Sequence, residues 1–103
     1  MKVLVVLGHQ HSGSFCHAIA AKANEQLRAA GHEVVYHDLY EECFDPILRE
    51  PELVRDAQLD PVIQQHCREL IEADGCIVIH PNWWGQPPAI LKGWVDRVFR
   101  QGL

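Results

Sequence analysis

The strongest constraint on the fold is the N-terminal run Lys2–Leu7, which is apolar and branched after its first residue and ends at Gly8. A strand without polar alternation is buried on both faces, which is typical of a central strand in a parallel sheet covered by helices. Parallel neighbours need a crossover connection, and such connections are right-handed and usually helical. The run therefore predicts an α/β fold.

The segments after this run have the order expected of a doubly wound fold. Apolar residues at helical spacing predict helices that begin near Phe15, Pro61 and Pro88, and apolar runs predict strands at Glu33–Leu39 and Cys76–His80. With the first strand central, the prediction is a three-stranded parallel sheet of order 2-1-3. Three buried helix stripes are predicted: Phe15, Ile19, Ala23, Leu27 and Ala30; Ile63, Cys67, Leu70 and Ile71; and Leu91, Trp94, Val95, Val98 and Phe99.

Residues suited to helix ends mark the boundaries of these helices. Ser12 or Ser14 can cap the first helix, and Gly31 supplies the left-handed residue that ends it. Asp60, followed by a proline, is a suitable start for the second helix, and Gly102 is the predicted stop of the third. The helix ends are thus predicted independently of the apolar pattern.

The segment Tyr40–Leu59 is the least regular part of the chain. It holds two prolines, many acids and little periodicity, which predicts a long surface excursion with one short helical turn. Asp96 and Arg97, in the third helix, are predicted on its outer face as a surface pair or a subunit contact. Long loops in compact domains are often functional.

Two loops follow the first and third predicted strands, His9–Ser14 and Pro81–Gln86. In a doubly wound sheet these loops are neighbours, and ligands bind outside the carboxyl ends of the strands. The first loop enters a helix N-terminus, which suits a phosphate, but has neither a Walker motif nor GxGxxG. The second carries two adjacent tryptophans, so together the loops predict a flavin nucleotide site. The alternatives are an ordinary strand–helix connection, and rings that cover the core or a subunit interface.

The composition argues against several classes of function. The 103 residues form at most one small domain, and the net charge of −5 argues against a nucleic-acid partner. No apolar run approaches the ~20 residues that span a membrane, and the N-terminus has no signal-peptide cleavage site. Four cysteines without CxxC or zinc spacing fit the reducing cytoplasm.

The histidines and Cys16 raise two further possibilities. His9, His11 and His17 are close in sequence but have no acid or cysteine at ligand spacing, so we expect no metal. Cys16 is predicted at a helix N-terminus, which lowers a thiol pKa and leaves a redox or nucleophilic role open. No base for such a role is fixed by the sequence.

The stretch HPNWWGQPPAILKGWVDRVFRQG at residues 80–102 resembles the signature of the flavodoxin-like NAD(P)H:quinone oxidoreductase family. That family also includes the ancillary oxidoreductases of bacterial potassium-efflux systems. The opening VLVVLGHQHSGSF, the DLY at Asp38–Tyr40 and the Asp45-Pro46 that follows are similar to the same family. The resemblance covers essentially the whole chain and implies a flavodoxin-like fold.

The resemblance implies a bound FAD or FMN, hydride transfer from NAD(P)H and two-electron reduction of a quinone. It also implies a homodimer with the active site at the subunit interface. By position, one group of residues would hold the flavin's phosphate and ribityl side: His9, Ser14, Phe15 and Cys16. A second group would line the isoalloxazine ring, with Trp84 in the aromatic floor: Pro81, Asn82, Trp83, Trp84 and Gly85.

The chain departs from the family pattern in two ways. Cys16 stands where members commonly have Asn, which removes a side-chain amide from the phosphate site but leaves the backbone N–H. The family's sheet has further strands, and its glycine-rich flavin loop, with a Tyr and a His tied to hydride transfer, has no counterpart before Leu103. We therefore expect residues 1–103 to be the N-terminal portion of one flavin-binding domain, with an apolar edge at the third strand and catalytic residues beyond Leu103.

Two classes of function remain at this stage. The first is a flavin-dependent quinone reductase. The second is a non-catalytic flavodoxin-type module, either an electron carrier or a regulatory subunit docked on a potassium-efflux transporter, or a truncated form without activity. We predict the first class, an NAD(P)H dehydrogenase (quinone)-like enzyme, and keep the second as the alternative because the glycine-rich loop is missing.

Overall fold

Three parallel strands form the centre of the structure, which is a computed structural model describing residues 1–100. The elements follow the predicted order: β1 (Lys2–Leu7), α1 (Phe15–Ala29), β2 (Glu33–Asp38), the short 3-10 helix η1 (Glu50–Leu53), α2 (Pro61–Glu72), β3 (Gly75–Ile79) and α3 (Ala89–Val98). The single short helical turn predicted in the excursion is η1. The predicted stop at Gly102 lies outside the described residues.

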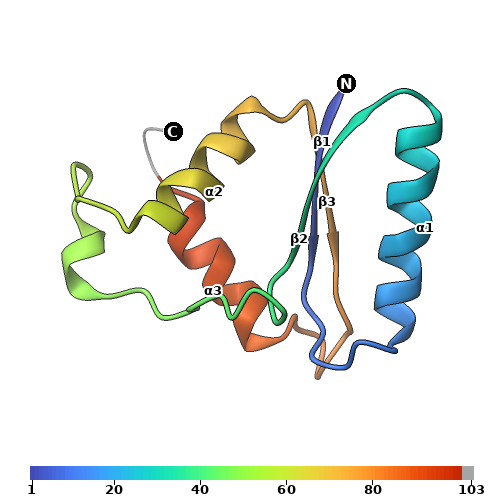
Figure 1. Ribbon diagram of the computed structural model, residues 1–103. Coiled ribbons are helices and arrows are strands. Elements are labelled where there is room, and N and C mark those ends of the chain that lie inside the picture. Colours follow the sequence, from blue (N-terminus) through green and yellow to red (C-terminus); the bar gives the residue numbers. More distant parts are fainter. Residues whose placement is uncertain (101–103) are drawn as a thin grey trace.

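The sheet has the predicted order β2-β1-β3, with β1 parallel to both neighbours. Helix α1 covers one face, and α2 and α3 cover the other (Figure 1). Leu4 and Val6 of β1 belong to the core cluster beneath α2 and α3, whereas Val3, Val5 and Leu7 belong to the cluster beneath α1. Burial of β1 on both faces explains why its sequence shows no polar alternation.

The predicted helix ends are confirmed by their hydrogen bonds. The Ser14 hydroxyl accepts from the backbone N–H of His17 at 3.1 Å, which caps α1. Gly31 has a φ of 87° and ends the same helix. The Asp60 carboxylate accepts from the N–H of Val62 at 2.9 Å at the start of α2.

The predicted buried stripe of α1 is wrong at its N-terminal end, whereas Leu27 packs against the core cluster beneath this helix as predicted. Phe15 is 80% exposed and Ile19 is exposed, whereas Cys16, Ala20 and Asn24 face the sheet. Small side chains at 16 and 20 let the helix backbone approach β1 closely, and bulky side chains at those positions would hold it away. Helix α1 therefore leaves an apolar pair exposed beside the strand-end loops.

The predicted stripes of α2 and α3 are correct except at their C-terminal ends. Ile71 and Phe99 are exposed. His66, which was not predicted in the stripe of α2, is buried. The indole N–H of Trp94 donates to the His66 Nδ1 atom at 3.0 Å, so the imidazole has a polar partner inside the core. A hydrophobicity count cannot foresee such a pair.

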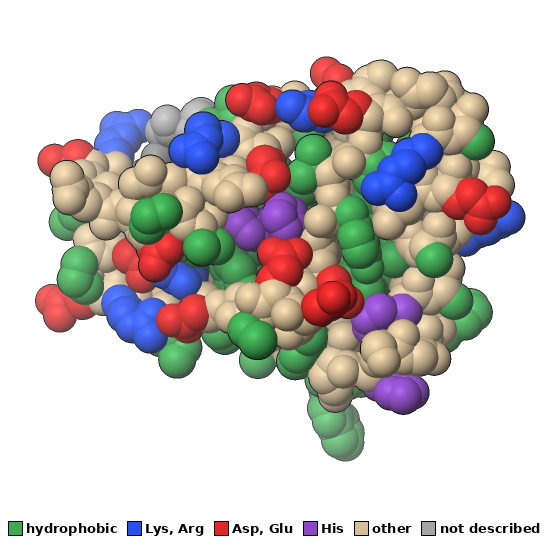
Figure 2. Space-filling model, viewed as in Figure 1, with side chains coloured by type: hydrophobic (Ala, Val, Ile, Leu, Met, Phe, Trp, Pro, Cys, Tyr) green, Lys and Arg blue, Asp and Glu red, His purple; other side chains and the backbone are tan. Residues whose placement is uncertain are grey.

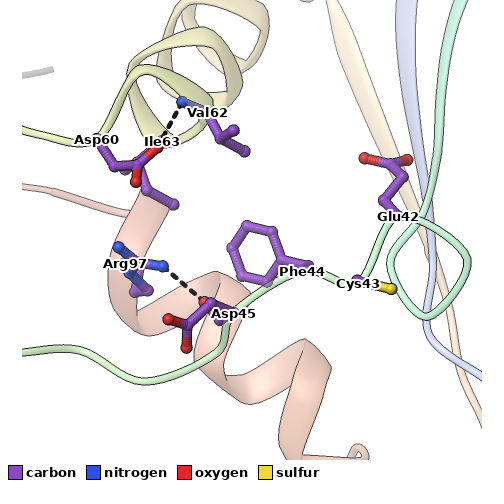
Figure 3. Close-up of a pocket in the computed structure, with 8 residues that line it drawn as sticks. All are labelled: Glu42, Cys43, Phe44, Asp45, Asp60, Val62, Ile63 and Arg97. Atoms are coloured by element: carbon purple, nitrogen blue, oxygen red, sulfur yellow. Dashed lines mark hydrogen bonds between the residues drawn. The ribbon is translucent and has the colours of Figure 1, made fainter.

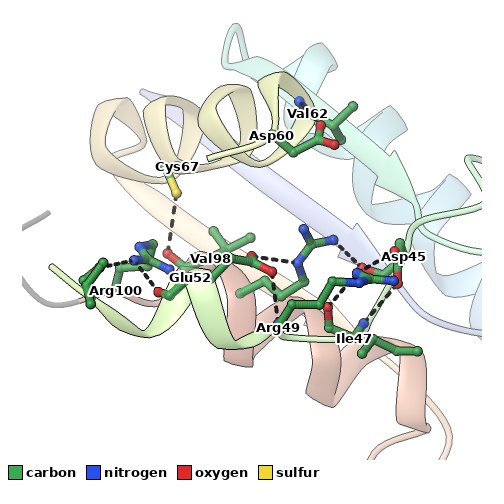
Figure 4. A network of polar contacts seen from close by, with 11 residues as sticks. Asp45, Ile47, Arg49, Glu52, Asp60, Val62, Cys67, Val98 and Arg100 are labelled. Carbon is green, nitrogen blue, oxygen red and sulfur yellow. Dashed lines mark hydrogen bonds and ion pairs between the residues drawn. The ribbon is translucent and has the colours of Figure 1, made fainter. Parts of the chain in front are cut away.

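The segment between β2 and α2 is fastened to α3 by Arg97. The Arg97 Nε donates to the Glu52 carboxylate at 3.0 Å, and its Nη1 donates to the Asp45 carbonyl at 2.7 Å. Figure 4 labels Glu52 and Asp45 in the polar network of this segment. Arg97 is therefore buried, and its predicted place on the outer face of the helix is wrong. A buried guanidinium is tolerated here because it is paired and hydrogen-bonded. Gly93 lies one turn earlier, directly against Pro46.

Strand β3 is an edge of the described sheet, with β1 as its only strand neighbour there. Ile77 and Val78 are exposed on it, as the sequence predicts for an apolar edge. Among the described residues no helix has the length and apolar character needed to cross a membrane.

Candidate functional site

The two predicted loops meet at the carboxyl edge of the sheet. The rings of His9 and Trp83 lie 6.1 Å apart, centroid to centroid, with their planes inclined by 63°. The backbone N–H groups of Gly8 and Leu39 donate to the last carbonyls of β3 and β1, at 3.0 Å each, so the three strands end level. Histidines gather at this end of the visible face, and hydrophobic side chains project below them (Figure 2).

The first loop borders a hollow of about 450 Å³ at the N-terminal end of α1. Its volume lies within the usual range for small-molecule sites. The His9 Nδ1 atom accepts from the N–H of His11 at 3.0 Å, so the neutral ring carries its proton on Nε2 as a donor. The hollow is lined by His9, Gln10, Ser12, His17, Asp38, Tyr40 and Glu41.

A hydrogen-bonded chain of three side chains crosses this region. The Ser14 Oγ atom lies 2.7 Å from His17 Nδ1, and His17 Nε2 lies 2.9 Å from an Asp38 carboxylate oxygen. Asp38 ends β2 and its other oxygen accepts from the N–H of Glu41 at 3.3 Å. These hydrogen bonds connect the N-cap of α1 to the end of β2. Nothing in the helical spacing singles out His17, so the sequence did not predict it as a site residue.

The second loop is a tight hairpin in which the Trp84 side chain is exposed to solvent. Trp83 and Gln86 exchange both backbone hydrogen bonds, at 2.9 and 3.0 Å. Between them Trp84 has a φ of 58° and Gly85 a φ of 76°, and the Trp84 side chain is fully exposed. A bulky residue in the left-handed region costs about 1–2 kcal/mol. A strained residue that presents an apolar ring to solvent makes the hairpin a candidate binding element.

The other predicted site residues have mixed positions. Phe15 is exposed at the start of α1, Asn82 is exposed and Pro81 is half-buried. The Cys16 side chain is buried in the core cluster beneath α1, so only its backbone can face a ligand at the helix end. A cysteine packed in this way does not suit the redox or nucleophilic role left open above.

Two histidines on the opposite face of the sheet form a buried cluster that the sequence did not predict. The rings of His37 and His66 stack with centroids 4.1 Å apart. His37 bridges two carboxylates, Glu42 at 2.9 Å and Glu69 at 2.8 Å. Burial lowers the pKa of His37, but the hydrogen bonds to both glutamates outweigh it and raise the pKa above its ordinary value. Burial, with His37 nearby, lowers the pKa of His66.

The donor set His37, Glu42 and His66 has nitrogen and oxygen atoms within 4.8 Å of one another, a spacing compatible with a metal ion. The indole N–H of Trp94 argues against that use. An indole only donates, so the Nδ1 atom of His66 must accept and the proton of the neutral ring sits on Nε2. The nitrogen that faces Glu42 therefore has no lone pair for a metal.

A smaller hollow of about 160 Å³ lies under the excursion, between the start of α2 and the end of α3 (Figure 3). Phe44 and Arg97 point into it, and the Arg97 guanidinium lies 6.0 Å from the centre of the Phe44 ring. Arg97 is already satisfied by Glu52 and Asp45. This hollow, and another of about 210 Å³ beside Glu52 and Arg100, are below the usual size of a cofactor site, which leaves the strand-end loops as the candidate among the described residues.

Comparisons with known proteins identify the family and the fold. The sequence model of a family described as Flavodoxin-like fold matches residues 1–103. The chain is 37% identical over 106 residues to an uncharacterized NAD(P)H oxidoreductase of Haemophilus influenzae, covering all of this chain and 52% of that protein. It is 35% identical over 121 residues to NAD(P)H dehydrogenase (quinone) 1 of Cavia porcellus, covering 99% of this chain and 44% of that protein.

A solved structure gives the same answer for the fold. The NAD(P)H:quinone oxidoreductase from Methanothermobacter marburgensis superposes with a TM-score of 0.90 at 30% identity, covering 99% of this chain and 54% of that one. The chain thus spans about half the length of the curated relatives that it matches.

Proposed function

Because the chain belongs to the flavodoxin-like fold family, we propose that it is part of a flavin-dependent NAD(P)H:quinone oxidoreductase. The observation that carries the proposal is the meeting of a helix N-terminus and a strained tryptophan hairpin at one edge of the sheet, at His9 and Trp83. The relatives' names, NAD(P)H oxidoreductase and quinone dehydrogenase, support the reaction class.

The residues present fit the two chemically different ends of a flavin nucleotide. At the phosphate end, the first-turn amides of Phe15 and Cys16 have no acceptor within the helix, and the helix dipole favours an anion there. The His9 Nε2–H adds a side-chain donor toward the hollow. Carboxylates such as Asp38 and Glu41, which line the hollow, can accept from sugar or ribityl hydroxyls.

At the ring end, the hairpin offers apolar surface. Trp83 is 39% exposed and Trp84 is fully exposed, so both have ring surface free for stacking. The hairpin backbone is rigid because both of its cross-strand bonds are made. A bound flavin supplies the two-electron acceptor that links a hydride donor to a quinone. The chain's contribution is to hold that ring and shield its covered face from water.

The cofactor is FAD or FMN and the donor NADH or NADPH in this proposal. A cytoplasmic homodimer is part of it, with the second subunit over the open side of the Trp84 hairpin. The groups that complete hydride transfer are not among the residues described above.

A second candidate is a non-catalytic electron carrier or regulatory subunit of the same fold. Full exposure of Trp84 favours it, because an uncovered aromatic ring is equally suited to docking against another protein.

An absorbance experiment separates the two candidates. Purified protein is loaded with FMN or FAD, and NAD(P)H and then menadione are added under anaerobic conditions. Bleaching of the flavin bands and their recovery support the reductase. A flavin that binds but is not bleached by NAD(P)H supports the electron carrier. A protein that takes up neither flavin contradicts the reductase and the electron carrier and leaves the regulatory subunit. Trp84→Ala should weaken flavin binding at least tenfold, whereas Ile71→Ala, at an exposed apolar residue of α2, should leave it unchanged.

A further inference from the structure

Ser14 serves two hydrogen-bond partners at the entrance to the candidate phosphate site. Its Oγ atom accepts from the backbone N–H of His17 at 3.1 Å and lies 2.7 Å from the Nδ1 atom of the same histidine. The hydroxyl has one hydrogen to donate. Where that hydrogen points decides whether Ser14 can contact an anion.

The Asp38 carboxylate determines which nitrogen of His17 is protonated in the neutral ring. An ionised carboxylate only accepts, so the Nε2 atom of His17, 2.9 Å from Asp38, carries hydrogen. The Nδ1 atom of neutral His17 is then a lone pair, and the Ser14 hydroxyl must donate to it. In that state Ser14 turns only lone pairs toward the site, which repel a phosphate oxygen.

Protonation of His17 reverses the bond between these two side chains. The Nδ1–H then donates to Ser14 Oγ, which still accepts from the backbone N–H, and the Ser14 hydrogen is free to turn outward. No covalent bond other than the new N–H forms, and the proton comes from solvent. The imidazolium form is therefore the one in which Ser14 offers a donor to an anion.

We propose that His17 is a positioning residue whose protonation is coupled to binding of a phosphate group by Ser14. The inference rests on the proposed flavin function for the identity of the phosphate, which is that of FMN or the matching group of FAD. Each phosphate bound takes up one proton through His17.

Charged and titratable groups face His17 from the neighbouring elements. Asp38 faces it from the end of β2, and Glu41 lines the same hollow from the turn beyond. His9, in the first loop, presents its ring at 6.2 Å from that of His17, centroid to centroid, in an edge arrangement. The His17 and Asp38 side chains are only 17% and 10% exposed, so water screens their pair incompletely. A dianionic phosphate adds to the negative field.

The test measures how many protons the protein takes up when it binds FMN, and does not depend on enzymatic activity. Calorimetric titration with FMN above pH 7.5, in two buffers with different ionisation enthalpies, measures protons taken up per ligand bound. The native protein should take up about one proton, and its affinity should fall up to tenfold per pH unit, as one-proton linkage requires. Riboflavin, which has the ring without the phosphate, should cause no uptake.

Two substitutions at histidines locate the proton. His17→Asn places an amide N–H beside Ser14 and cannot titrate, so FMN should bind with no proton uptake and no pH dependence. His32→Asn is the matched control, since His32 lies at the opposite end of the sheet, near the N-terminal amine, and uptake should be unchanged. Circular dichroism checks that each variant is folded. In the native protein, ¹⁵N NMR spectra of the histidine rings, recorded with and without inorganic phosphate, measure the protonation of His17 directly.

The outcomes separate this inference from the flavin proposal. FMN bound without uptake, or with the same uptake in His17→Asn, overturns the role of His17 and leaves the flavin proposal standing. No flavin bound, with inorganic phosphate still protonating the His17 ring, overturns the flavin proposal and supports the coupling. If neither flavin nor phosphate binds, both are overturned.

Discussion

Replacing Gly93 by alanine tests how the excursion after β2 is held against α3. A Cβ atom at Gly93 would overlap the Cβ, Cα and carbonyl oxygen of Pro46. The last two are backbone atoms, so no rotamer change relieves the clash. The next residue toward β2 is Asp45, whose carbonyl is bound by Arg97 at 2.7 Å, so the excursion must shift with its anchor.

The size of the effect follows from two opposing terms. Overpacking of a tight contact costs up to about 3 kcal/mol, and alanine gains about 1 kcal/mol over glycine inside a helix. The expected net loss for Gly93→Ala is therefore about 2 kcal/mol. Gly75→Ala is the control, because nothing lies within 4 Å of its added Cβ and its φ is not positive. That change should stabilise the chain by up to about 1 kcal/mol.

Urea unfolding followed by tryptophan fluorescence measures both variants, since Trp94 is buried in the core next to this contact. The free energy of unfolding should fall with urea concentration by about 1 kcal/mol per M. The urea midpoint of Gly93→Ala should therefore fall by about 2 M, and that of Gly75→Ala should stay unchanged or rise. A midpoint for Gly93→Ala that is unchanged, or that rises as helix propensity alone predicts, would refute the close packing.

Three further predictions concern other parts of the structure. Arg97→Met should destabilise the chain by about 3–5 kcal/mol, because Glu52 stays buried without its partner, and Glu52→Gln in the same chain should recover part of the loss; no recovery in urea unfolding argues against the pair. Trp84→Asn should stabilise the chain by about 1 kcal/mol, since asparagine tolerates the left-handed region, yet weaken flavin binding at least tenfold; undiminished binding in a fluorescence titration contradicts the role of this ring. The pKa of His37 is raised above 6.5, against the effect of burial, by two glutamates, so its stabilisation is fully present below pH 6.5 and is lost as pH rises through the folded pKa. Urea midpoints between pH 6 and 9 should show this loss in the native chain and not in His37→Gln.

Much of the fold could be predicted from local signals. The unbroken apolar run of β1, the cap at Ser14 and the glycine at Gly31 act through backbone geometry or complete burial, and each was confirmed. The meeting of the two loops followed from strand order alone, and the contact between His9 and Trp83 confirms it.

The failures share one cause, which is that contacts with residues distant in sequence decide burial. Arg97 was predicted outside because arginine is rarely buried, and its partner Glu52 lies 45 residues earlier in the chain. His66 is buried because Trp94 satisfies it from another helix. In α1 the helical stripe was judged by hydrophobicity, whereas the face that meets the sheet is selected by small size at Ala20. No single-sequence pattern contains these long-range contacts.

The most direct test of the account is an NMR titration of the three tryptophan indole N–H signals with FMN. The account predicts large shifts for Trp83 and Trp84, which lie on the strand-end hairpin. Trp94 should stay unchanged, because its N–H is bound to His66 inside the core. Shifts confined to Trp94, or no shift at saturating FMN, would contradict a flavin site at this edge of the sheet.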